Sequence, residues 1–60
     1  MSIEEIRAKA DITVDEIHNE IDEREGRIFC MQMSENPKMN RIYELQKEIH
    51  ELKGMIEDAK

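Results

Sequence analysis

Residues 41–59, RIYELQKEIHELKGMIEDA, decide the fold of this chain. Their apolar residues recur at steps of 3, 4, 3, 4 and 3, an average of 3.5 residues that keeps one apolar stripe on one side of a helix. Isoleucine holds every a position, and leucine or alanine holds d, a combination that favours parallel dimers. The stripe ends at Ala59, and its first five residues, called the seam below, are the predicted dimer contacts: Ile42, Leu45, Ile49, Leu52 and Ile56.

The start of this helix has its own signal. Asn36 is a favourable N-cap and Pro37 suits the first helical position, so the sequence predicts a helix over residues 37–59. Gly54 falls at heptad position f, which faces solvent, so it should weaken the helix without disturbing its packing.

The seam does not identify its own partner. It spans fewer than three full heptads, and a coiled-coil assignment needs about three to four. The same stripe could pack against the N-terminal half of its own chain as an antiparallel hairpin. A parallel dimer, an intrachain hairpin and a four-helix bundle made of two hairpins all satisfy the pattern.

The N-terminal half carries two helix-start signals. Ser2 and Thr13 each precede a Glu three residues later, which is the capping-box pattern. We therefore expect a short helix over residues 3–10 and a second helix over residues 14–33. A single continuous helix with a register shift near residue 11 is the alternative. Arg24 occupies one of the apolar positions of the second helix.

These segments predict an all-α fold with a single domain. The chain has 60 residues, of which 38% are hydrophobic, and it has one cysteine, which excludes an intrachain disulfide. Ordering a chain of this size costs on the order of 1.5 kcal/mol per residue, which a small core hardly offsets. We therefore expect a helical hairpin that forms a homodimer.

The negative charge lies in the N-terminal part of the chain. Residues 1–25 hold nine acids and three bases, whereas residues 26–60 hold six of each, so the whole net charge of −6 belongs to the first segment. A segment with its own charge often has its own partner, although it can simply keep a small protein in solution. The candidate acidic face consists of Asp15, Glu16, Asp22 and Glu23.

Residues 6–21 resemble the bacterial helix-turn-helix motif, which implies DNA binding. Arg7 stands where that motif has a small residue, however, and Asp11 stands in place of the turn glycine. The helix that would recognise DNA, residues 14–25, has six acids and one arginine, and the phosphate backbone would repel it. We expect no direct contact with nucleic acid.

An apolar group should gather where the second and third helices meet. Methionine side chains adapt to irregular surfaces, and here they flank both aromatic residues of the chain. They form either an adaptable contact patch or the filled end of a helical core. The group consists of Phe29, Met31, Met33, Met39 and Tyr43.

Catalytic and metal-binding patterns are not evident in the sequence. Both histidines, His18 and His50, should be exposed, and Cys30 should be a buried, inert thiol. We predict no metal, no cofactor and no enzymatic activity. The sequence also shows no secretory signal and no membrane-spanning segment, which indicates a soluble cytoplasmic protein.

Three kinds of function fit these features. The first is a homodimeric regulator or inhibitor that binds a larger protein, as small acidic phage-type inhibitors of host defence enzymes do. The second is a nucleic-acid mimic that blocks the cationic groove of a nuclease or helicase. The third is a structural adaptor that attaches through its coiled coil.

Overall fold

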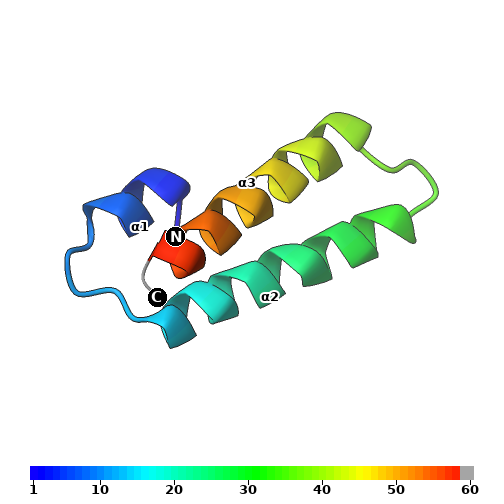
Figure 1. Cartoon of the computed structure of the whole chain (residues 1–60). Helices are drawn as coiled ribbons and strands as arrows, with labels where there is room; N and C mark the ends of the chain where they lie inside the picture. The colour runs from blue at the N-terminus through cyan, green and yellow to red at the C-terminus, as the bar shows by residue number, and fades with distance from the viewer. Residues whose placement is uncertain (59–60) are drawn as a thin grey trace.

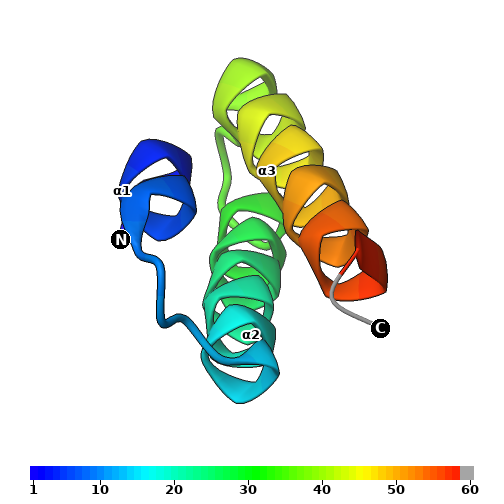
Figure 2. The same ribbon diagram turned by 60° about the vertical axis from the view of Figure 1, so that its left-hand side comes forward.

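Three helices make up the chain in the computed structural model, which describes residues 1–58. They are α1 (Ile3–Ala8), α2 (Val14–Gln32) and α3 (Met39–Asp58). The two long helices form an antiparallel hairpin, and α1 lies beside it (Figures 1 and 2). The molecule is elongated, with principal extents of 39 × 17 × 17 Å. The all-α prediction is confirmed for the described residues.

Both predicted helix caps are present. The Ser2 hydroxyl oxygen accepts a hydrogen bond from the Glu5 backbone N–H at 3.2 Å, and Thr13 accepts one from Glu16 at the same distance. Two complete starts explain why the N-terminal half is two helices rather than one. The first helix ends at Ala8 rather than at residue 10, with extended backbone at Lys9.

The start of α3 differs from the prediction. The first carbonyl to accept a helical hydrogen bond is that of Lys38, from the N–H of Ile42, so Asn36 and Pro37 lie before the helix. Proline disfavours helical backbone in the residue before it, and the six residues 33–38 are used to cross from one antiparallel helix to the other. The predicted last residue, Ala59, lies outside the described part of the chain.

The core runs along the line where the helices meet. All five seam residues are buried, with exposed fractions of 0–9%, and they pack within the chain against residues of α2 and α1. Their partners are Ile6 from α1 together with Ile17, Ile21 and Ile28 from α2. Of the arrangements left open by the sequence, the intrachain hairpin therefore accounts for the burial of the seam.

The helix α1 covers only part of the hairpin. Arg7 of α1 contacts Glu51 of α3, and Met1 and Lys9, which flank α1, contact Glu20 and Glu16 of α2. The helix α1 therefore runs alongside the half of the hairpin that is away from the α2–α3 loop (Figure 1). We call that half the base and the other end, around residues 33–38, the tip. At the tip, only α2 and α3 are present (Figure 1). None of the helices in the described residues is long and apolar enough to cross a membrane.

Candidate functional site

Four large apolar side chains stay exposed around the tip. Phe29 and Met33 lie one turn apart at the end of α2, and Met39 and Tyr43 lie one turn apart at the start of α3. Their exposed fractions are 63%, 73%, 66% and 70%, in the same order. We call these four residues the tip patch. Met31, the fifth residue of the predicted group, is half-buried and packs against the core instead.

The helical repeat explains why these side chains face outward. Ile28 and Met31 take the inward positions of α2, and Ile42 and Leu45 take those of α3. Phe29 follows Ile28 and therefore points about 100° away from it around the helix. Met39 and Tyr43 are separated by four residues and share one side of α3. The core at this end is thus complete without the tip patch.

The same geometry corrects the prediction for Cys30. The thiol is exposed, not buried. In the sequence, Cys30 lies between Ile28 and Met31, which both face the core. The helical repeat turns the Cys30 side chain to the outer side of α2, and Ile28 and Met31 already fill the core at this level. Both histidines are exposed, as predicted.

The candidate acidic face predicted from the sequence is only partly free of contacts within the chain. Asp15, Asp22 and Glu23 are exposed on α2, whereas Glu16 is half-buried and accepts a hydrogen bond from Lys9 Nζ at 3.0 Å. This contact and the charge of Glu16 raise the pKa of Lys9 above its ordinary value. Glu16 therefore holds the segment between α1 and α2 in place, and it is less available to a partner.

A further carboxylate extends this face. Glu25 is exposed and lies three residues after Asp22, so the two share one side of α2. The sequence pattern included this residue among the acids of the segment but gave no reason to select it. Among residues 1–58, no ion pair involves Asp15, Asp22, Glu23 or Glu25, and we call these four residues the acidic face.

A buried ionic network lies beneath α1. Arg24 is 6% exposed, and its Nε donates to Glu48 Oε1 at 3.0 Å. Its Nη1 donates to the backbone carbonyl of Glu20, and its Nη2 donates to the carbonyl of Met1. The N-terminal ammonium lies 3.1 Å from Glu20 Oε1. The network therefore joins α2 and α3 to Met1, two residues before α1 begins.

The network determines the ionisation of Glu20. Burial of this carboxyl raises its pKa, but the adjacent N-terminal ammonium and Arg24 outweigh that effect and lower the pKa below its ordinary value. The carboxylate is thus held in its charged form inside the fold. Sequence spacing placed Arg24 in an apolar position, but it could not identify Glu48, which is 24 residues away.

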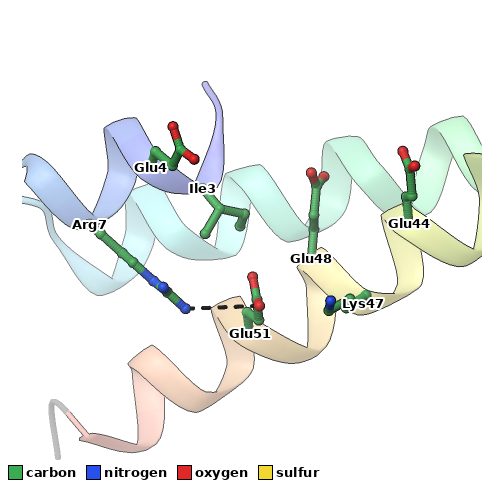
Figure 3. Close-up of a pocket in the computed structure, with 7 residues that line it drawn as sticks. All are labelled: Ile3, Glu4, Arg7, Glu44, Lys47, Glu48 and Glu51. Carbon is green, nitrogen blue, oxygen red and sulfur yellow. Dashed lines mark ion pairs between the residues drawn. The ribbon is translucent and has the colours of Figure 1, made fainter.

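An open groove separates α1 from α3. It has a volume of about 320 Å³ and is lined by Ile3, Glu4, Arg7, Glu44, Lys47, Glu48 and Glu51. Arg7 reaches across it to Glu51, with 3.9 Å between Nη2 and Oε1 (Figure 3). Glu48 belongs to the Arg24 network, and Glu44 lies 3.2 Å from Arg41. Three of the four groove glutamates are therefore paired with an arginine, two of them with an arginine that does not line the groove.

Charge is distributed along the hairpin as well as along the sequence. Residues 26–47, which form the tip and the adjoining turns, contain four bases and two acids, a net charge of +2. The remaining residues of the second half, 48–60, contain four acids and two bases, a net charge of −2. The tip is thus apolar and weakly cationic, and residues 1–25, which carry −6, form much of the base.

Groups of three or more potential metal ligands are not found among residues 1–58. Comparisons with protein-family models, with curated proteins and with solved structures find no match. The surfaces that distinguish this molecule are therefore the acidic face and the tip patch.

Proposed function

We propose that this chain is a non-catalytic binding protein that uses its acidic face to regulate or inhibit a larger protein. One observation carries the proposal: Asp15, Asp22, Glu23 and Glu25 are exposed on a single helix, and no cation within residues 1–58 pairs with them. Structural carboxylates elsewhere in the molecule are engaged, as at Glu20 and Glu48. Unpaired charge of one sign favours a partner surface of the opposite sign.

The partner expected for this face is a protein with a basic surface. Clustered carboxylates steer a cationic partner into place and suppress binding of acidic ones. Such interactions weaken with salt, because the Debye length falls from about 10 Å at 0.1 M to about 3 Å at 1 M ionic strength. The strength of capture should therefore depend on both the carboxylates and the salt concentration.

The test compares three immobilised proteins in lysate from the native host. The first is the wild type, and the second is the triple variant Asp22→Asn, Glu23→Gln, Glu25→Gln. This variant spares Asp15, which supports the first turn of α2, and Glu16, which binds Lys9. The control is the triple variant Glu35→Gln, Glu57→Gln, Asp58→Asn, which changes the net charge equally at other exposed sites.

A protein that the wild type and the control retain, and that the acidic-face variant releases at lower salt, supports the proposal. Equal retention by all three proteins contradicts it. Circular dichroism of each variant verifies that the helical fold is intact.

The nucleic-acid mimic is a special case of this proposal. It is favoured by the exposure of the carboxylates along one straight helix, where they could occupy a groove built for phosphates. Adding a duplex oligonucleotide to the captured complex distinguishes the two mechanisms. Displacement of the partner by the duplex supports mimicry, and retention of the partner supports a protein-specific regulator.

Homodimerisation is the second part of our proposal, but it requires a surface other than the seam. Ile42, Leu45, Ile49, Leu52 and Ile56 are already used within one chain. A parallel coiled coil through these residues would require the hairpin to open, and the structural adaptor depends on the same residues. A second copy is better accommodated by a surface that the folded chain leaves exposed.

A further inference from the structure

We infer that the tip patch is the surface through which two copies of this chain associate, tip to tip, with their acidic ends pointing away from each other. The inference deepens the homodimer proposed above, but it is independent of the partner assigned to the acidic face. It rests on the exposure of the patch, on the area that it offers and on the distribution of charge.

The patch is a surface that the fold does not need for itself. Ile42 and Leu45 beneath it are 2% and 1% exposed, so the tip core is closed without Phe29, Met33, Met39 or Tyr43. All four side chains are nevertheless large and at least 63% exposed. A monomer's largest apolar patch is commonly about 300–600 Å² and is often a contact surface.

The area fits a small homodimer. Side chains of this size present on the order of 200 Å² when fully exposed, so two copies of the patch would remove about 1,000 Å² from water. This approaches the lower limit of about 1,200 Å² for specific interfaces, and the apolar stems of the rim residues supply the remainder. A larger buried core is also what a 60-residue chain most needs for stability.

The rim of the patch carries both signs of charge. Lys38 provides a cation and Glu35 provides an anion, and both are exposed in the loop that joins Met33 to Met39. A two-fold axis places a patch against its own copy, so cations of one chain can face anions of the other. If the partner had a surface of one charge sign, a rim made only of the opposite sign would fit it better. The mixed rim therefore favours a second copy.

The acidic ends determine the orientation. Residues 1–25 carry a net charge of −6, and they would repel each other if two hairpins packed side by side in parallel. Residues 26–47 carry a net charge of +2, so two tips repel each other much less than two bases do. In the tip-to-tip arrangement, the bases lie at opposite ends of an assembly built from two molecules, each 39 Å long. This separation exceeds the Debye length of about 8 Å at physiological ionic strength several-fold. The acidic faces of both copies then remain open.

Sedimentation equilibrium over a range from low micromolar to millimolar concentration tests association. The wild type should approach twice the monomer mass of 7.2 kDa. The double variant Phe29→Gln, Tyr43→Gln should remain monomeric with unchanged helicity, because both side chains are exposed in the single chain. The control Val14→Thr alters an exposed apolar residue at the base and should dimerise like the wild type.

The single cysteine tests the orientation. A spin label on Cys30, which is exposed near the tip, should give a distance between the two labels well below the 39 Å length of one molecule. A label at the base, in the variant Cys30→Ser, Val14→Cys, should give a distance longer than 39 Å in a tip-to-tip dimer, whereas a parallel side-by-side dimer would give short distances at both sites. A wild type that stays monomeric throughout overturns the inference. So does a dimer that survives the double variant, one whose Cys30 labels lie further apart than one molecular length, or one whose labels at position 14 lie close together.

These results are separable from the test of the acidic face. Loss of dimerisation in the Phe29→Gln, Tyr43→Gln variant should leave salt-sensitive capture of a basic partner measurable. If the wild type is monomeric and this variant loses the captured protein, the tip patch is a docking site for that protein, and self-association is excluded.

Discussion

Arg24 Nε on α2 donates a hydrogen bond to Glu48 Oε1 on α3 across 3.0 Å, within what is otherwise an apolar interface. The guanidinium also donates to backbone carbonyls of Glu20 and Met1, so one side chain joins α2, α3 and the N-terminal residue that precedes α1. A buried cation with several partners fixes the relative positions of helices that apolar side chains alone would hold less specifically.

Replacing Arg24 with methionine should destabilise the fold strongly. The change leaves Glu48 without the cation that donates to it, and it leaves Glu20 with the N-terminal ammonium alone. Removing one partner of a fully buried pair costs about 3–5 kcal/mol, and because the Glu48 side chain is 30% exposed, the loss should lie at or below the lower end of that range. The double variant Arg24→Met, Glu48→Leu should recover part of that loss, because it also removes the carboxylate that loses its cation. Urea denaturation followed by circular dichroism measures both effects. An Arg24→Met midpoint equal to that of the wild type would show that the network contributes nothing to stability.

Acidification should weaken the fold through Glu20. Its pKa is lowered in the folded state, so its stabilising contribution is fully present above its unfolded pKa of about 4.3 and is lost as the pH falls through the lower folded value. Urea midpoints measured from pH 6 to pH 2 should therefore decline for the wild type below about pH 4. Glu20→Gln should start from a lower stability and decline less. Parallel curves for the two proteins would contradict the assignment.

Gly26→Ala and Gly54→Ala should each stabilise the chain. Both glycines lie within helices, neither has a positive φ, and an added Cβ meets no atom within 4 Å at either position. Alanine is favoured over glycine in a helix by about 0.5–1 kcal/mol per site. The two sites are far apart, so the double variant should gain the sum of both effects. A fall in the thermal midpoint on either substitution would be inconsistent with the helix geometry.

Thr13→Ala should cost about 1 kcal/mol, because it removes the hydroxyl that accepts from the Glu16 N–H at 3.2 Å. Thr13→Ser is the matched control, since serine keeps the hydroxyl and should be close to the wild type. Thermal denaturation of the three proteins compares them. If the alanine and serine variants melt together, the cap does not contribute to the start of α2.

Much of this fold follows from local sequence signals. The 3-and-4 spacing marks which residues of α3 are buried, and the hydroxyl caps at Ser2 and Thr13 place the two helix starts. These features depend on residues within one or two turns, so they are visible in a single sequence. The start of α3 was misplaced because a favourable cap and a proline do not show how many residues the loop needs.

The missing information concerns contacts between distant parts of the chain. The seam has the same spacing whether it packs on its own chain or on another, so its partner could not be identified from periodicity. Arg24 was recognised only as a polar residue in an apolar position, and Cys30 was expected inside although the core is filled by its neighbours. Lys9 removes Glu16 from the free acidic surface through a contact seven residues away.

The incomplete coverage of the hairpin by α1 gives its two halves different resistance to local opening. Backbone amides of the base lie where three helices meet, whereas near residues 33–38 only α2 and α3 are present (Figure 1). Amide hydrogen exchange should therefore begin at the loop and proceed along the hairpin, with the slowest exchange near Arg24. The tip, which presents Phe29 and Tyr43, is thus also the end that unfolds locally first. Any molecule that covers the tip would therefore slow the opening of the whole hairpin.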